Sequence, residues 1–222
     1  MKFLTISKLL MIAILPFLIF LIAFNIYGFD IKFYREKFSE YKIQNDVPNA
    51  VSINEKVINF ITGKNNDLPN EFNNGEKQHL QDVKKVVGVS TIVLYVFIVA
   101  FIVLLVISAL ILKANNYITN FVGKVLVFGG FLTIILAGLL FLFISSDFSA
   151  AFESFHTLLF QKGTYVFDPA KEMIVRLYPE QVFMDLGMNM SKLVLITSFI
   201  IILLGLLLLF KSKSKKNKNT RK

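Results

Sequence analysis

The chain contains two histidines, and both could take part in proton transfer. His79 lies in the stretch EKQHLQDVKK, and His156 lies in ESFHTLLFQKGTYVFDP. Histidine is the side chain whose charge changes near neutral pH, so it suits general acid and base catalysis. The chain has no cysteine, which excludes thiolate nucleophiles, thiolate metal ligands and disulfides. Candidate chemistry therefore falls on the two histidines and on nearby carboxylates.

Each histidine follows a glutamate by three residues, Glu76 before His79 and Glu153 before His156. Paired Glu-x-x-His helices form half of a di-iron carboxylate site, which needs two further glutamates from other helices of a bundle. The long apolar segments contain no acid, so pairing on a helix surface explains the spacing more simply, and we expect no metal. No Gly-x-Ser-x-Gly motif is present. Gly163 and Thr164 alone are too short to form a phosphate-binding loop, so we expect no nucleotide as a partner.

Four segments are free of charged residues over lengths that would span a bilayer. Only 18% of the chain is charged, whereas soluble domains usually carry about 25%. The segments 9–29, 86–112, 125–146 and 193–210 contain 21, 27, 22 and 18 uncharged residues. Crossing the hydrocarbon takes roughly 17–25 apolar residues. The sequence therefore predicts an all-α integral membrane protein with four transmembrane helices.

The charges between these segments predict the orientation. Residues 1–8, 113–124 and 211–222 hold eleven lysines and arginines and no acid, whereas all 15 acids lie in 30–85 and 147–192. Short basic segments stay in the cytoplasm. Both termini should then be cytoplasmic, and 30–85 and 147–192 should form a small extracellular cap. The basic tail has no aromatic residue to stack on bases, so we expect no nucleic acid as a partner.

The expected organisation runs from the first membrane helix to the basic tail. The first segment is longer than the apolar core of a secretory signal and lacks a small-x-small cleavage site, so we expect a retained anchor. The expected parts are membrane helices at 1–29, 86–112, 125–146 and 193–210, cap segments at 30–85 and 147–192, a cytoplasmic loop at 113–124 and a cytoplasmic tail at 211–222.

The cap segments carry helical patterns. Ser52 and Glu55 have the spacing of a capping box that would start a helix, and Gly63 should end it. Phe148, Phe152, Phe155 and Leu159 have the spacing of one face of an amphipathic helix. Residues 164–169 should be extended because the residue before a proline avoids the helical region.

Both histidines fall near an expected outer membrane boundary. His79 precedes Lys85 by six residues, about 9 Å along a helix, and His156 follows the third apolar segment by ten. Two histidines at one depth favour a shared site over two isolated surface residues. Arg176 could bind an anionic group through two N–H groups of its guanidinium, or it could pair with a neighbouring acid.

Two stretches of the sequence resemble the signatures of the Lit family, the bacterial lipoprotein intramolecular transacylases. FHTLLFQKGTYVFDP followed by VRLYPEQVFMD is similar to one signature, and NGEKQHLQDVKK is similar to the other. VINFITGKNNDL also resembles the cap segment between them, so the resemblance covers nearly the whole chain. Tyr165 stands where the family usually has tryptophan.

The resemblance implies a function and a site. The substrate would be a diacylglyceryl-modified lipoprotein, whose sn-2 acyl chain moves from the glyceryl ester to the α-amine of the N-terminal cysteine without a cofactor. The catalytic residues would be His79 and His156, at the outer face of the bacterial cell membrane. We expect Tyr34, Phe155, Phe160, Tyr165, Phe167 and Arg176 to contact the substrate. The alternative is a non-catalytic membrane receptor or assembly factor whose cap binds lipid or peptide.

Overall fold

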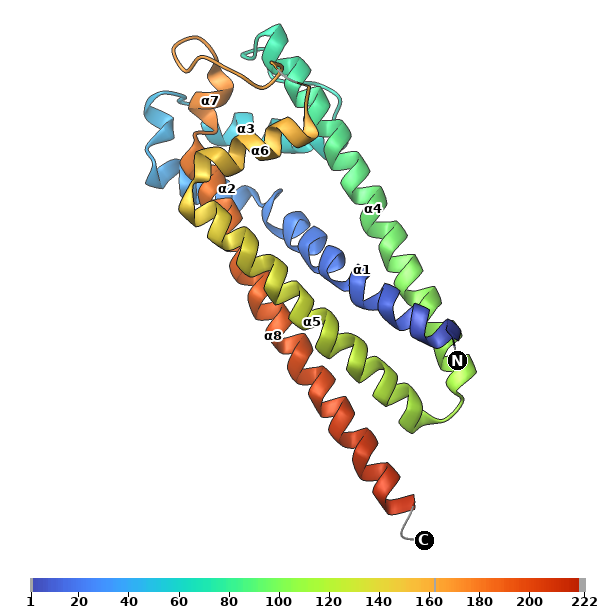
Figure 1. Ribbon diagram of the computed structural model, residues 1–222. Coiled ribbons are helices and arrows are strands. Elements are labelled where there is room, and N and C mark those ends of the chain that lie inside the picture. Colours follow the sequence, from blue (N-terminus) through green and yellow to red (C-terminus); the bar gives the residue numbers. More distant parts are fainter. Residues whose placement is uncertain (1, 162, 220–222) are drawn as a thin grey trace. The chain divides into compact units, whose positions relative to one another are not determined.

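Four long apolar helices dominate the computed structural model, which describes residues 2–161 and 163–219. In these residues the chain forms eight α-helices and one short 3-10 helix, and no strand. Four helices are long and apolar enough to cross a membrane, as expected. Their order is α1 (Lys2–Tyr27), α2 (Ile31–Glu40), η1 (Ile43–Asn45), α3 (Ala50–Ile61), α4 (Asn74–Leu112), α5 (Asn115–Ser146), α6 (Phe148–Leu159), α7 (Met173–Leu177) and α8 (Glu180–Asn219), labelled in Figure 1.

The chain forms two compact units, and the first consists of membrane helices. This membrane unit comprises Met1–Ala23, Val93–Phe141 and Met190–Lys222, so it holds most of the four long helices. One part of its core joins Leu15 and Ile19 of α1 to Ala137 of α5 and Val194 of α8. Outward-facing side chains such as Leu110 and Leu207 are large and apolar, which suits contact with lipid.

Close backbone contact between α5 and α8 depends on two glycines. A Cβ built on Gly123 would lie 2.9 Å from the carbonyl oxygen of Gly205, and one on Gly205 would lie 2.9 Å from that of Gly123. Small residues of this kind let membrane helices approach closely, since lipid provides little hydrophobic force to join them.

The second unit, the cap unit, comprises Phe24–Ile92 and Leu142–Asn189. It contains the short helices α2, α3, α6 and α7 and the neighbouring ends of the long helices (Figure 1). Polar side chains join its segments. The Lys37 ammonium lies 2.6 Å from the Asp185 carboxylate, and the Tyr178 hydroxyl donates to Asn54 Oδ1 at 2.8 Å.

Helix ends differ from the expected boundaries at several places. Ser52 and Glu55 do not start a helix, because α3 begins at Ala50, and its N-cap residue Asn49 makes no side-chain capping bond. Most of the expected loop 113–124 is helical, because the chain turns at Lys113, with φ 54°, and α5 begins at Asn115. The helix α8 extends beyond 193–210 in both directions. The limits of the bilayer on these helices stay predictions.

Candidate active site

Well-capped helices carry both histidines. Asn73 and Glu76 form a reciprocal capping box at the start of α4: Asn73 Oδ1 accepts from the Glu76 amide at 3.0 Å, and Glu76 Oε2 accepts from the Asn73 amide at 2.6 Å. His79 follows one turn later, ahead of the uncharged segment of α4. At α6, Asp147 Oδ1 accepts from the Ala150 amide at 2.9 Å. His156 then lies in the last turn of α6.

The cap unit brings the two histidines together. Their ring centres lie 6.1 Å apart with the ring planes 21° from parallel. Both are buried, with 7% of His79 and 9% of His156 exposed. The pair therefore forms one site.

Five aromatic rings surround this pair, and we call them the aromatic enclosure. His156 contacts Phe152 at 4.1 Å and Tyr165 at 5.1 Å between ring centres, and both Phe155 and Phe160 at 5.5 Å. His79 contacts Phe160 at 4.9 Å and Phe167 at 5.5 Å. The enclosure lowers the polarity around the imidazoles and limits their access to water.

Hydrogen bonds assign a tautomer to His156. Its Nδ1 lies 2.8 Å from the carbonyl oxygen of Phe152, one turn earlier in α6. A carbonyl oxygen only accepts, so the neutral ring carries its proton on Nδ1 and a lone pair on Nε2. In contrast, His79 Nδ1 is buried and has no hydrogen-bond partner among the described residues. Buried polar atoms usually have a hydrogen-bond partner, so this nitrogen is an exception within the site.

Burial favours the neutral form of both histidines. Burial and, to a smaller extent, the nearby His156 lower the pKa of His79 to about 4, although Asp82 partly opposes this. Burial also lowers the pKa of His156, against the opposing effects of the Phe152 carbonyl and the Glu153 carboxylate. Near pH 7 the site therefore holds two neutral imidazoles, one of which presents a free basic nitrogen.

The sequence matches the family model described as "Lipoprotein intramolecular transacylase Lit" over residues 5–183. The chain belongs to the Lit family. The family is named for a transacylase, so this protein is an enzyme. The resemblance that the two sequence signatures indicated is confirmed. A comparison with curated proteins gave no match.

Solved structures of the membrane-integral Lit from Bacillus cereus have the same fold. One matches with a TM-score of 0.80 and 23% identity, and covers 95% of this chain and 98% of the other. Two variants with a histidine replaced match with TM-scores of 0.78. The arginine variant is 23% identical, covering 96% of this chain and 94% of its own, and the alanine variant is 24% identical, covering 95% and 96%.

Four of the six expected substrate-contacting residues lie at the histidines, namely Phe155, Phe160, Tyr165 and Phe167. Tyr34 lies in the core of the cap unit instead, where its hydroxyl donates to the Gly28 carbonyl and its ring contacts Tyr178. Arg176 is exposed, and its Nε donates to the Glu172 carbonyl. The structure therefore groups neither Tyr34 nor Arg176 with the enclosure.

One residue of the enclosure and one residue that caps the helix carrying His79 were not among the expected ones. Phe152 lies nearest to His156, and its position one helical turn earlier was a usable signal. Glu76 is only 1% exposed, so it is not the helix-surface partner that its spacing indicated. Its second oxygen, Oε1, accepts from the Ile174 amide at 2.7 Å and so connects α4 to α7.

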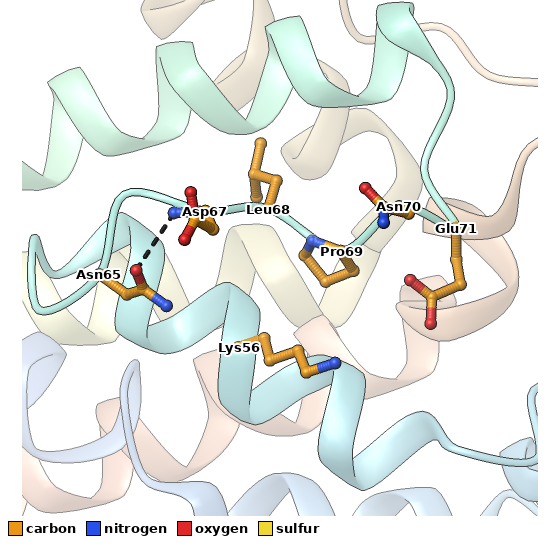
Figure 2. A pocket seen from close by; sticks show the side chains of 7 residues that line it. All are labelled: Lys56, Asn65, Asp67, Leu68, Pro69, Asn70 and Glu71. Atoms are coloured by element: carbon orange, nitrogen blue, oxygen red, sulfur yellow. Dashed lines mark hydrogen bonds between the residues drawn. The ribbon is translucent and has the colours of Figure 1, made fainter.

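A separate hollow of about 330 Å³ lies between α3 and the loop that follows it (Figure 2). Its lining is mostly polar, and within it the Asp67 amide donates to Asn65 Oδ1 at 3.3 Å. The lining residues are Lys56, Asn65, Asp67, Leu68, Pro69, Asn70 and Glu71. They include no histidine and no aromatic ring, so the hollow lacks the groups that acyl transfer would use.

Proposed function

We propose that the protein moves the sn-2 acyl chain of a diacylglyceryl lipoprotein onto the α-amine of the same lipoprotein's N-terminal cysteine. The observation that carries this proposal is the pairing of His79 and His156 inside an aromatic enclosure, in a chain of the Lit family. Nucleophile and ester belong to one molecule, so the protein's main task is to fold them together at reacting distance.

His156 acts as the base. Its Nε2 lone pair takes a proton as the neutral amine attacks the ester carbonyl carbon, which forms the N–C bond. When the intermediate collapses, the bond between the acyl carbon and the glyceryl oxygen breaks, and the proton goes to that oxygen. The products are an amide and a hydroxyl group, so the exchange balances without a cofactor.

His79 acts on the oxygen side of the reaction. An imidazolium acid at this position would be scarce near pH 7, because the pKa is about 4. The neutral ring can instead donate an N–H hydrogen bond to the oxygen on which negative charge develops.

The surroundings of the histidines suit a lipid substrate. Phe155, Leu158 and Val166 are 53%, 82% and 72% exposed, so apolar surface lies on and beside the enclosure. Acyl chains can lie against such surface. A water-poor site also protects the ester, because hydrolysis is the competing reaction.

The charge pattern supports an extracellular location for the site. With the basic segments in the cytoplasm, both termini are inside the cell, and the cap unit faces outward from the bacterial cell membrane. Its substrates would then be lipoproteins anchored in the outer leaflet of that membrane.

Mass spectrometry of one lipoprotein's N-terminal peptide tests this function directly. Cells that express the protein should yield the N-acyl, S-monoacylglyceryl peptide, whereas matched cells without it should yield the diacylglyceryl peptide with a free amine. Identical peptides from both would contradict the proposed function.

A further inference from the structure

Residues 163–168, which we call the strap, place one ring on each histidine. The strap begins at Gly163, whose φ of +92° is a conformation that other residues rarely adopt. Tyr165 contacts His156 and Phe167 contacts His79, while Val166 between them is 72% exposed. The strap thus supplies two of the five rings in the enclosure.

Hydrogen bonds from the Tyr165 hydroxyl tie the strap to α6. This hydroxyl donates to Glu153 Oε1 at 3.0 Å and lies 3.0 Å from Thr157 Oγ1. Thr157 also donates to Glu153 Oε1, at 3.4 Å. Glu153 and Thr157 flank His156 on the same helix, so the strap is fixed beside the base. Phenylalanine could fill the same space, but it could not form this connection.

We propose that the Tyr165 hydroxyl is a positioning group that selects the amine over water as the acyl acceptor. Held by Glu153 and Thr157, the strap keeps its rings on the histidines while the ester is being attacked. When it is released, water reaches the same carbonyl carbon. The water oxygen then bonds to the acyl carbon, and the bond between the acyl carbon and the glyceryl oxygen breaks. A proton from the water goes to the glyceryl oxygen, and a fatty acid leaves with the amine still free. This inference rests on the proposed function.

The test uses the full-length protein in lipid with a diacylglyceryl lipoprotein and measures two products. Mass spectrometry counts the N-acylated peptide, and fatty-acid analysis counts the hydrolysed chains. Because surface hydrogen bonds contribute modestly, Tyr165→Phe should raise the ratio of hydrolysis to transfer about five- to tenfold. Tyr95→Phe removes a hydroxyl from an exposed tyrosine elsewhere and should leave the ratio unchanged.

Two replacements of Glu153 separate the hydrogen bond from the charge. Glutamine keeps a carbonyl acceptor for the Tyr165 hydroxyl, so Glu153→Gln should keep the ratio near that of the unchanged protein. Leucine has no acceptor, but the Thr157 hydroxyl could still accept from Tyr165. The double replacement Glu153→Leu with Thr157→Val removes both partners, so it should raise the ratio as Tyr165→Phe does.

The outcomes separate this inference from the proposed function. If the unchanged protein forms N-acylated peptide and Tyr165→Phe keeps its product ratio, even with lower total activity, the hydroxyl has only a structural role and the inference is wrong. If the unchanged protein forms no N-acylated peptide, the proposed function and the inference both fail.

Discussion

His156 Nδ1 lies 2.8 Å from the carbonyl oxygen of Phe152, and this contact leaves Nε2 as the basic nitrogen of the site. Burial lowers the pKa of His156 below its usual 6.5 because it disfavours the charged ring. The rate should fall twice on acidification. The first fall should come near the pKa of the attacking α-amine, about 7.7–8.0, because only the neutral amine attacks. The second should come from His156, because a base must be neutral to accept a proton, and its acidic midpoint should lie below 6.5. Initial rates between about pH 4.5 and 9 test this, and the absence of a second fall below pH 6.5 would contradict it.

The Glu153 carboxylate opposes that shift, because its negative charge favours the protonated ring. Replacing it in Glu153→Gln should therefore move the acidic midpoint to a still lower pH, with the plateau rate nearly unchanged. The matched replacement Glu55→Gln, on α3, removes a charge elsewhere in the cap unit and should leave the midpoint unchanged. A midpoint that rises in Glu153→Gln would show that Glu153 does not act on His156 through its charge.

The two histidines should behave as one catalytic unit. His79→Ala and His156→Ala should each lower transfer roughly 10²–10⁴-fold, the range for single acid–base groups. Groups that act together are strongly non-additive, so the double variant should be little slower than the worse single one. Near-native formation of N-acylated peptide by either single variant would return that histidine to a structural role.

The membrane helices were predictable because their signal is local. A run of 18–27 residues without charge has few outcomes besides a membrane span. The same signal does not show where a helix ends in the polar flanks, so α4 and α8 extend beyond their apolar segments. Capping patterns are ambiguous in a similar way. Ser52 and Glu55 match a capping box as well as Asn73 and Glu76 do, yet only the second pair forms one.

The candidate site was predictable only in part. The two histidines could be placed at a similar level relative to the membrane, because each lies a known number of residues from the end of an apolar segment. Which of the many aromatic rings contact them depends on tertiary packing, so Tyr34 was expected there, although its ring packs against Tyr178. Glu76 is buried and accepts from the Ile174 amide, a partner far away in sequence, so its local spacing could not indicate this environment.

Glu76 should stabilise the cap unit. Glu76→Ala leaves the buried Ile174 amide without an acceptor and removes half of the capping box, which should cost about 1–3 kcal/mol. Thermal unfolding in detergent, followed by circular dichroism, should show a lower midpoint. The exposed Glu71 is a control, and Glu71→Ala should change little. Equal midpoints for the two variants would contradict a stabilising role for Glu76.

The contact between Gly123 and Gly205 predicts that two glycine-to-alanine replacements on α5 will shift the thermal midpoint in opposite directions. In Gly123→Ala the new Cβ would meet a backbone oxygen at 2.9 Å, which cannot move without separating α5 from α8. The thermal midpoint should fall. Gly138 is also on α5 but has no heavy atom within 4 Å of its built Cβ, so Gly138→Ala should keep or raise the midpoint, since alanine favours helix by about 1 kcal/mol. A fall of the same size in both variants would show that close packing at Gly123 is not the cause.

The orientation can be tested with single cysteines, because the chain has none of its own. Asn66 and Lys171 are exposed positions in the two acidic segments, and Ser214 is exposed near the basic end. Transfer of positive charge across the membrane is disfavoured during insertion, so the basic segments should be cytoplasmic. Cysteines at Asn66 and Lys171 should therefore react with an impermeant thiol reagent in intact cells, and one at Ser214 should react only after permeabilisation. Labelling of Ser214 alone in intact cells would reverse the orientation and place His79 and His156 on the cytoplasmic side, away from lipoproteins of the outer leaflet.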